Sequence, residues 1–592
     1  MSVQARRYPL PLAGSSLAAL VPCSRGSGCP LGVNIPALAA VTRDGDGARA
    51  RTIVRAANPF ASSCGHGCHA PCETACRRRH HGAPVAIGAL EMYAASATPS
   101  AGMRDEGPCS SAHDARSVAG LAGRIADQPS HAGGSGKRVA IVGAGAAGMA
   151  CAHDLALLGH PCVIFDAEQE PGGLLTRGIP DFRFPTASIR SECADILALG
   201  VEFRGAMPIQ GSDALGALLG DGFDAVFLAV GASAPREPLF EDGERAATID
   251  AMALLRGGAS VAGRVVVIGD GDLAVDAARV AARIGRYASG RDQVEIQLVL
   301  TTPIERSSIS PAMVGAAIHD GIAIRDGWTP RRMCVEDGRV SAIEIARQDG
   351  RMSSIVQCDY LVTAAPRVAA LDALGTRLTV DGAGHIAVDP DTLRTTVPGV
   401  WAGGACAFGH RSIAHAVADG KRAAWHIHAA LEGVPVRAAI LSAWVEADDR
   451  RPEHTQQAHT TIRRALPLRG TAPVDPFSPS ALPDAESMRQ EAARCYDCSI
   501  VPSVDDACTL CGTCVAECPE EAFSIDGDPR RLELDQDRCT RCGICAERCP
   551  EGAITMVRAV WEERLTTARP PVETPTMEES GCADEEPAFT PR

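Results

Sequence analysis

The sequence predicts an α/β core of two nested Rossmann-like domains, flanked by an α-helical N-terminal domain and a small α+β C-terminal domain. Three observations predict this fold class. β-branched runs alternate with Ala-rich stretches between residues 137 and about 432, which is typical of α/β proteins. Two glycine-rich fingerprints lie inside that region. Most of the 24 cysteines gather in two groups, one near each end of the chain.

The composition sets the scale and excludes some classes of protein. The chain has 592 residues, which at roughly 150 residues each suggests about four domains. Hydrophobic residues make up 46% of the chain, so it can bury several ordinary cores. The net charge of −15 argues against a nucleic-acid partner. We expect no membrane span, because no run approaches the length of about 18 apolar residues that a span needs. Prolines interrupt the first twenty residues, so we expect no export signal and a cytoplasmic chain.

The C-terminal cysteines repeat one spacing twice. A C-x2-C-x2-C-x3-C-P pattern begins at Cys508 and recurs 31 residues later at Cys539. Three thiolates at this spacing bind one [4Fe–4S] cluster, and the fourth, before the proline, reaches across to the other cluster. Zinc knuckles are the alternative, but they need no interleaved repeat. The module resembles a bacterial two-cluster ferredoxin, with one cluster on Cys508, Cys511, Cys514 and Cys549 and the other on Cys539, Cys542, Cys545 and Cys518.

The first glycine fingerprint has its full structural context. A strand over 137–142 runs into the fingerprint at the head of a helical stretch, and a second strand ends at Asp166. The glycines let the backbone approach a pyrophosphate at a helix N-terminus, and the acid accepts from a ribose hydroxyl. We therefore expect a dinucleotide here, bound by Gly143, Gly145, Ala146, Ala147, Gly148 and Asp166.

The second fingerprint follows a strand over 265–268. Gly269, Gly271, Asp272 and Leu273 form it, and Ala274 replaces the third glycine. Its two aspartates put negative charge beside a phosphate site, so an ordinary strand–turn–helix is the alternative. The first domain resumes at Gly403-Gly404, followed by a helix from Ile413. One fingerprint nested inside another domain is typical of flavoproteins with FAD on the first site and NADH or NADPH on the second.

Several short motifs carry a family resemblance. They are Asn58-Pro59-Phe60, Cys64-Gly65-His66-Gly67-Cys68, Pro71-Cys72-Glu73, Pro171-Gly172-Gly173-Leu174-Leu175 and Gly178-Ile179-Pro180-Asp181-Phe182-Arg183. Over residues 20–430 the sequence resembles the glutamate synthase small-subunit (beta subunit) family, which shares its core with the flavin end of dihydropyrimidine dehydrogenase. The resemblance implies an FAD- and NAD(P)-dependent oxidoreductase, with further cofactor contacts at Gly172, Gly173, Leu174, Arg183 and Gly231.

The resemblance also implies an N-terminal [4Fe–4S] cluster on Cys29, Cys68, Cys72 and Cys76. The family usually opens with an additional C-x2-C pair for a second cluster, and here none precedes Cys23. A matching pair, Cys495 and Cys498, stands at the far end of the chain instead. Our hypothesis is that this pair folds back to join Cys23, with Cys64 as a further candidate. A vestigial pair or a mononuclear site is the alternative.

Three departures from the family pattern affect the cofactor sites. Ala405 replaces the aspartate that normally follows the two glycines and holds a ribityl hydroxyl. Thr301-Thr302 stand where NADPH-preferring members often have paired arginines, which favours NADH, although Arg306 is nearby. Cys151 and Cys162, which follow the first fingerprint, form no C-x2-C or C-x4-C pair, so we expect no dithiol relay.

These observations predict an electron-transfer flavoprotein without a catalytic acid, base or nucleophile of its own. We expect it to exchange electrons between NAD(P)H, FAD, the clusters and a ferredoxin or partner oxidoreductase subunit, in a hetero-complex or homo-oligomer. The alternatives are a glutamate synthase small subunit that feeds a glutaminase-type large subunit, and an iron–sulfur scaffold or redox sensor with a decayed flavin site. We expect Arg77–His81 to be a solvated surface turn, and His410 and His415 to be helix-start or packing residues.

The predicted organisation has eight segments. They are a helical iron–sulfur domain (1–95), a linker (96–136), the first part of the FAD domain (137–258), the NAD(P) domain (259–365), the FAD-domain return (366–432), a connector (433–490), the ferredoxin domain (491–558) and a disordered tail (559–592).

Overall fold

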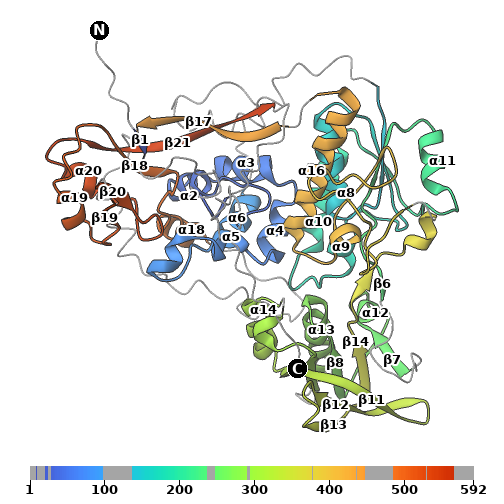
Figure 1. Ribbon diagram of the computed structural model, residues 1–592. Coiled ribbons are helices and arrows are strands. Elements are labelled where there is room, and N and C mark those ends of the chain that lie inside the picture. The colour runs from blue at the N-terminus through green and yellow to red at the C-terminus, as the bar shows by residue number, and fades with distance from the viewer. Residues whose placement is uncertain are drawn as a thin grey trace, which may run out of the picture.

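The computed structural model places the N-terminal helices between the C-terminal module and the first α/β domain (Figure 1). The structure describes residues 8–9, 21–24, 28–97, 136–235, 247–289, 294–307, 309–375, 378–434, 437–446, 484–527 and 530–565. Nearly all of the predicted linker, most of the predicted connector and the tail beyond Leu565 lie outside these residues. No helix among the described residues has both the length and the apolar character needed to cross a bilayer.

The first α/β domain is built on a five-stranded sheet of order β16-β5-β2-β3-β4, in which every pairing is parallel. Four of its strands precede the second domain and one follows it. Helix α8 packs tightly against α16 over the first sheet. The elements are β2 (Val139–Val142), α8 (Ala146–Leu157), β3 (Cys162–Phe165), α9 (Leu174–Arg177), α10 (Thr186–Leu197), β4 (Glu202–Arg204), α11 (Ala214–Gly220), β5 (Ala225–Leu228), β16 (Val400–Ala402), α15 (Ala405–Phe408) and α16 (Ile413–Glu432).

The second α/β domain occupies the sequence between β5 and β16. Its parallel sheet has the order β10-β9-β8-β14-β7, and a three-stranded antiparallel sheet, β11-β12-β13, adjoins it. A two-residue pairing of β6 with β15 links the domains. The elements are β6 (Ala234–Pro235), β7 (Thr248–Asp250), α12 (Ala251–Leu255), β8 (Arg264–Ile268), α13 (Asp272–Ser289), β9 (Glu295–Leu300), η3 (Ile304–Arg306), α14 (Pro311–His319), β10 (Ala323–Asp326), β11 (Trp328–Glu336), β12 (Arg339–Arg347), β13 (Ser353–Gln357), β14 (Tyr360–Thr363), β15 (Arg367–Val368) and η4 (Leu371–Leu374).

The N-terminal domain is helical, as its composition predicts. Side chains cap its first two helices: Asn34 accepts from the Ala37 amide at 3.2 Å, and Asp46 accepts from the Arg49 amide at 3.0 Å. Short helices then carry the cysteines. The elements are α2 (Ile35–Arg43), α3 (Gly47–Ala57), α4 (Ala61–Gly67), α5 (Pro71–Thr74), η1 (Arg77–His81) and α6 (Ile87–Ser96).

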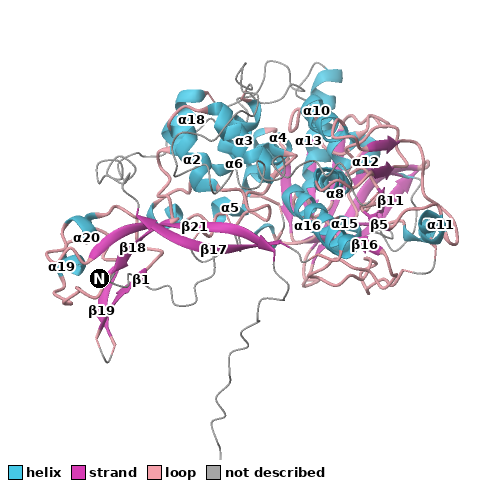
Figure 2. Cartoon of the chain, turned by 90° about the horizontal axis from the view of Figure 1, so that it is seen from above, coloured by secondary structure: helices cyan, strands magenta, loops and turns pink. Residues whose placement is uncertain are grey.

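The C-terminal module contributes to a four-stranded antiparallel sheet of order β1-β18-β21-β17. This sheet reaches from the C-terminal module towards the first α/β domain (Figure 2). The elements are β1 (Tyr8–Pro9), β17 (Arg437–Glu446), α18 (Ala485–Ala492), β18 (Ile500–Val504), α19 (Thr513–Ala516), β19 (Phe523–Asp526), β20 (Arg531–Leu534), α20 (Ile544–Glu547) and β21 (Ile554–Leu565).

Two predicted segments differ from this structure. The connector begins with a strand, β17, and the segment we expected to be a disordered tail from residue 559 begins inside β21. The reason is that the two strands satisfy each other's backbone groups over nearly their whole lengths. That pairing joins segments far apart in the sequence, so neither strand carries a local signal for it.

The two ends of the chain share one hydrophobic core. Met488, Ala492 and Val501 are buried together with Val21 and Leu38 of the N-terminal domain. Helix α18 packs against α2 and α6. The cysteine-rich segments at the two ends of the sequence are therefore neighbours in space.

Candidate functional site

The first fingerprint forms a turn between β2 and α8 that only glycine fits at two positions. Gly143 has φ 107°, and a Cβ there would collide with the Ala229 carbonyl. A Cβ at Gly148 would collide with the Gly143 carbonyl, which lies directly against the helix. The loop therefore leaves its backbone amides accessible to a pyrophosphate at the start of α8.

Two other glycine pairs meet this loop. Gly172 donates to the Ala144 carbonyl at 2.8 Å, and a Cβ at Gly173 would lie 2.9 Å from Gly145 Cα. A Cβ at Gly404 would lie 3.0 Å from Ala147 Cβ. The structure thus brings together the fingerprint, Gly172-Gly173 with Leu174 at the start of α9, and Gly403-Gly404. Gly231, with φ 71°, follows β5 on the same sheet.

Asp166 holds the fingerprint loop at its other side. Its carboxylate accepts from the Ala144 amide at 2.6 Å and from the Glu168 amide at 2.8 Å. Each carboxylate oxygen can accept more than one hydrogen bond, so the group retains capacity for a ribose hydroxyl.

A buried aspartate lies beside the position where Ala405 breaks the family pattern. Asp419, on α16, accepts from the Gly404 amide at 3.1 Å and forms an ion pair with Arg411. It comes from a helix rather than from the residue after the two glycines. The sequence pattern gave no reason to single it out.

Both aspartates of the second fingerprint have hydrogen-bond or ion-pair partners within the protein. Asp270 accepts from the Thr302 amide at 2.9 Å and from the Thr301 hydroxyl. Arg183 pairs with Asp272 at 2.7 Å and with Asp276, and His69 of the N-terminal domain lies 3.0 Å from Asp272. Burial raises the pKa of Asp276 to about 6, against the opposing effect of Arg183. Arg183 and Asp272, both expected as cofactor contacts, therefore form a network that joins three domains, while Gly269, Gly271 and Leu273 remain at the start of α13.

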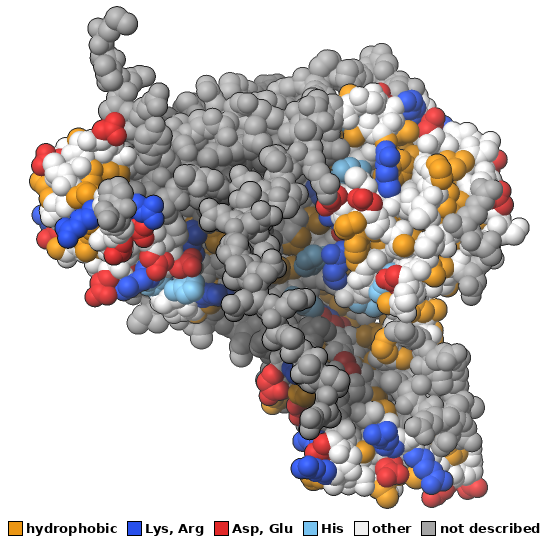
Figure 3. Space-filling model, in the orientation of Figure 1, with side chains coloured by type: hydrophobic (Ala, Val, Ile, Leu, Met, Phe, Trp, Pro, Cys, Tyr) orange, Lys and Arg blue, Asp and Glu red, His pale blue; other side chains and the backbone are white. Residues whose placement is uncertain are grey.

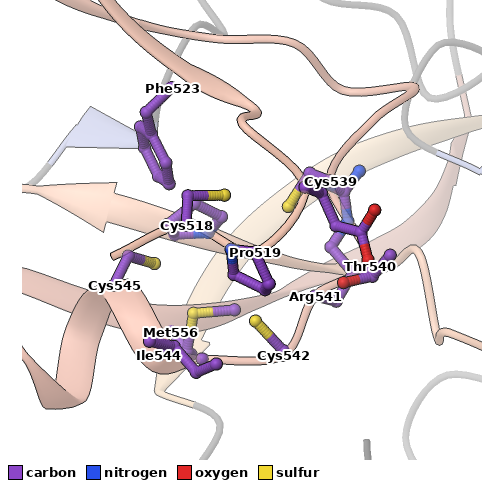
Figure 4. Close-up of a pocket in the computed structure, with 13 residues that line it drawn as sticks. Cys518, Pro519, Phe523, Cys539, Thr540, Arg541, Cys542, Ile544, Cys545 and Met556 are labelled. Carbon is purple, nitrogen blue, oxygen red and sulfur yellow. The ribbon is translucent and has the colours of Figure 1, made fainter. Parts of the chain in front are cut away.

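The C-terminal cysteines surround two cavities, each of about 330 Å³. Cys518, Cys539, Cys542 and Cys545 line the inner cavity, where Figure 4 shows the four thiols pointing toward one space. The outer cavity is lined by Cys508, Cys511, Cys514 and Cys549. These are the two interleaved sets that the spacing predicts. Each set fits a [4Fe–4S] cluster, because four thiols line one cavity.

The N-terminal cysteines also form two groups, but their membership differs from our expectation. Burial raises the pKa of the Cys23 thiol, and the nearby charges of Cys498, Cys76 and Cys495 raise it further. The pKa of Cys495 is likewise raised by burial and then by Cys498 and other neighbours that include Cys76. Cys76 is therefore a neighbour of Cys23 and of the displaced pair, an association that the resemblance did not imply.

A buried carboxylate faces the other N-terminal group. Burial raises the pKa of Cys29 to about 12, and Glu91 and then Cys68 contribute to that rise. Among neighbouring charges, that of Glu91 also raises the pKa of Cys72 the most. Cys64 lies close to Cys68 and Glu91. Sequence reasoning missed Glu91, since one acid on an otherwise apolar helix carries no ligand spacing.

The Arg77–His81 stretch is an interface and not the solvated turn that we expected. Arg77 and Arg78 are buried; Arg77 pairs with Asp537 at 3.0 Å, and His81 with Glu520 at 3.2 Å. These residues join η1 to the C-terminal module. His80, His81 and acids of the module line a groove there, and pale-blue histidines lie among red acids on the left-hand lobe in Figure 3.

Three known families match separate parts of the chain. Residues 137–420 match pyridine nucleotide-disulphide oxidoreductases. Residues 20–103 match the 4Fe-4S cluster domain II of dihydropyrimidine dehydrogenase, and residues 507–554 match the 4Fe-4S dicluster domain. The matches fall on the nested α/β domains, the N-terminal helices and the two C-terminal cavities.

Curated relatives align with about two thirds or more of this chain. The beta subunit of NADP(+)-dependent formate dehydrogenase from Moorella thermoacetica is 32% identical, over 71% of this chain and 62% of that protein. The small chain of glutamate synthase [NADPH] from Mycobacterium tuberculosis is 28% identical, over 67% of this chain and 83% of that one. The chain is therefore similar to the glutamate synthase small chain, and its N- and C-terminal regions match iron–sulfur cluster domains.

A further relative is the beta subunit of NADPH-Fe(3+) oxidoreductase from Geobacter sulfurreducens, at 28% identity over 68% of this chain and 63% of that one. The chain thus spans under two thirds of the length of two of these relatives. Among solved structures, thioredoxin reductase of T. acidophilum aligns with 50% of this chain and 98% of its own length, at 21% identity and a TM-score of 0.42.

Proposed function

We propose that this flavoprotein is an NAD(P)H:acceptor oxidoreductase with FAD in the first α/β domain, a nicotinamide cofactor in the second and four [4Fe–4S] clusters. When bound, the flavin and the clusters supply the conversion between a hydride pair and single electrons. The observation that carries the proposal is the order of the four ligand groups in space. They form a series from the first α/β domain to the exposed Cys511.

The first ligand group adjoins the flavin end. Helix α4 packs against α10 and α16 of the first α/β domain, and a Cβ at Gly67 would lie 2.8 Å from Ile413. Cys68 follows directly. We propose Cys29, Cys68 and Cys72 as ligands, with Glu91 as the fourth because its charge acts on both Cys29 and Cys72, whereas Cys64 is a neighbour of Cys68.

The second group closes the two ends of the chain onto one site. Its proposed ligands are Cys23, Cys76, Cys495 and Cys498. Cys72 and Cys76 both belong to the segment around α5, so the same turn serves the first and second groups. The pair that we hypothesised to fold back thus has its partners in Cys23 and Cys76, while Cys64 stays with the first group.

The third and fourth groups are the inner and outer cavities of the C-terminal module. Cys514 of the outer group and Cys545 of the inner group are close enough for their charges to interact. Cys511 is exposed, which gives the outer group contact with the surface. We propose this end as the docking point for a ferredoxin or a partner oxidoreductase subunit.

The names of the relatives favour a hetero-complex, since they are subunits of a formate dehydrogenase, a metal-ion oxidoreductase and a glutamate synthase. Those names also place NADPH above NADH, in contrast to the Thr301-Thr302 signal. The intact glycine cradle and Asp419 favour a working flavin site over a decayed one. We propose Gly143, Gly145, Gly148, Asp166 and Gly404 as its principal backbone and carboxylate contacts.

An anaerobic titration of the purified full chain with NADPH and with NADH, followed by absorbance and EPR, tests the proposal. We expect one nucleotide to bleach the flavin and then to produce the signals of reduced clusters. Failure of both nucleotides to bleach the flavin would overturn the assignment of the second α/β domain. Purified protein without bound or restorable FAD would overturn the oxidoreductase function.

A further inference from the structure

One arginine lies between the second and third ligand groups. Arg541, inside the inner cysteine pattern, is fully buried at 0% exposure. Its guanidinium bonds to the side chains of Cys539 and Gln536. Among neighbouring charges, those of Cys539 and then Cys498 act most strongly on Arg541. Cys539 belongs to the third ligand group and Cys498 to the second. Figure 4 shows the residue beside Cys539 and Cys542 at the edge of the inner cavity.

Arg541 is the cation between the second and third ligand groups, because the other cations nearby interact with other residues. Among carboxylates, the charge of Asp537 acts on Arg541, and this acid is mostly exposed and pairs with Arg77. Arg78 is directed at the Tyr496 ring, 4.9 Å from its centroid, and His81 pairs with Glu520. An arginine side chain stays protonated at all accessible pH values, so its charge is permanent.

The backbone of the repeat does not require an arginine here. Arg541 has φ 63°, and the equivalent residue of the outer repeat, Leu510, has φ 55°. The left-handed conformation therefore belongs to the cluster-binding loop in both halves. Burying a guanidinium is costly unless it is paired, so a cation at only the inner position calls for a role that the outer loop lacks.

We propose that Arg541 is a positioning residue that raises the reduction potentials of the second and third clusters together, and so favours their reduction relative to the flavin, the first cluster and the outer cluster. This proposal rests on the four-cluster function above. In the step concerned, one electron leaves the cluster on Cys23, Cys76, Cys495 and Cys498, which is oxidised, and enters the cluster on Cys518, Cys539, Cys542 and Cys545, which is reduced. Each reduction adds one negative charge, which a fixed cation in a low-dielectric site stabilises.

The test is an EPR-monitored redox titration of the full chain in three forms: wild type, Arg541→Met and Arg541→Lys. We expect Arg541→Met to lower the reduction equilibrium constants of the second and third clusters about tenfold, which is about 59 mV for a one-electron couple. The flavin and the outer cluster should keep their potentials. Arg541→Lys should retain most of the wild-type values, because it preserves the charge.

Unchanged potentials in an iron-replete Arg541→Met protein would overturn the proposal, as would equal shifts in the Met and Lys variants. If Arg541→Met loses iron, Arg541→Gln replaces it. Loss of iron from both neutral variants, with iron retained by Arg541→Lys, would overturn the proposal by showing that the residue holds a cluster in place. A wild-type protein that contains fewer than four clusters would instead overturn the proposed function.

Discussion

The two halves of the C-terminal module share a ligand pattern but have different surroundings. Each half has the same cysteine spacing and a proline after its fourth cysteine. In each half, the residue directly before the second cysteine adopts the left-handed conformation. In the inner half that residue is the buried Arg541, and the N-terminal helices pack nearby. In the outer half it is Leu510, and Cys511 is exposed.

The difference teaches that spacing defines a cluster, whereas the residues between the ligands define its place in an electron-transfer series. The inner half joins the N-terminal domain through Arg77–Asp537 and His81–Glu520. The outer half presents a ligand to solvent. We therefore propose the inner set as an internal relay and the outer set as the exit.

We expect the largest effect when the electron-transfer series is interrupted before or after the inner half of the C-terminal module. Cys495→Ser/Cys498→Ser removes the second cluster, so NADPH or NADH should no longer reduce either C-terminal cluster, although the flavin should still bleach. Cys511→Ser removes only the exit, so the inner cluster should still be reduced. EPR after nucleotide addition measures both variants. Full reduction of the outer cluster in the double variant would show that electrons bypass the second group.

The next effect concerns the docking of the inner half. Arg494 and Glu491 form a buried ion pair at 2.5 Å, each with 3% of its side chain exposed, and Arg494 donates to the Ala83 and Pro84 carbonyls. Arg494→Met removes the guanidinium that balances the charge of the buried Glu491 carboxylate, which should lower the free energy of opening of α18 by about 3–5 kcal/mol. Hydrogen exchange over residues 485–504 measures it.

The exposed pair Arg489–Glu486 on the same helix is the matched control. Glu486→Gln should leave the same exchange rates nearly unchanged, because an exposed ion pair contributes little to stability. Equal effects of the two substitutions would contradict a docking role for the buried pair.

A pH effect should distinguish the flavin-side contact from the ferredoxin-side contact. Glu192 accepts from the Ser62 amide at 2.7 Å and from the Ser63 hydroxyl at 2.5 Å, and burial raises its pKa from 4.5 to about 7. The protonated form is therefore favoured in the folded state. Its stabilisation is present below pH 4.5 and is lost as the pH rises through 7, by up to about 3 kcal/mol.

Hydrogen exchange in α4, compared with Glu192→Gln at each pH, measures this effect. The wild type should lose protection relative to the variant between pH 4.5 and about 8. The contacts of the permanently charged Arg494 should show no such trend. A constant ratio between wild type and variant across this range would contradict the prediction.

We expect the smallest effect when Leu510 of the outer half is replaced by arginine, the residue at the equivalent position of the inner half. Leu510→Arg gives the outer half the cation of the inner half, but in a more solvated place where charge is screened. The potential of the outer cluster should rise by less than the shift expected for Arg541→Met. Leu510→Met is the control for size. If the new cation left the potential of the outer cluster unchanged, a cation beside the first cysteine pair would not be sufficient to raise a cluster potential.

Sequence and structure agree where the signal is local. The interleaved C-terminal ligands and both fingerprints follow from fixed spacings, because a tight turn and a cluster loop are specified within a few residues. Glu91 and Asp419 could not be predicted, since each reaches its site through the packing of a helix. The burial of Arg77 and Arg78 likewise depends on a module that is distant in sequence.

The division of the N-terminal cysteines shows the same limit. The resemblance implies that Cys76 joins Cys29, Cys68 and Cys72, whereas we propose that it joins Cys23, Cys495 and Cys498, because the charges of these four thiols act on one another. Adjacent turns carry both groups, so the spacing cannot say which cluster each cysteine serves. That choice depends on where α18 docks.

Iron quantitation on anaerobically purified full chain tests the central claim most directly, namely that both ends of the chain close one cluster. The account predicts about 16 iron atoms per wild-type chain and about 12 after Cys495→Ser/Cys498→Ser. About 12 in the wild type, unchanged by the double substitution, would contradict it.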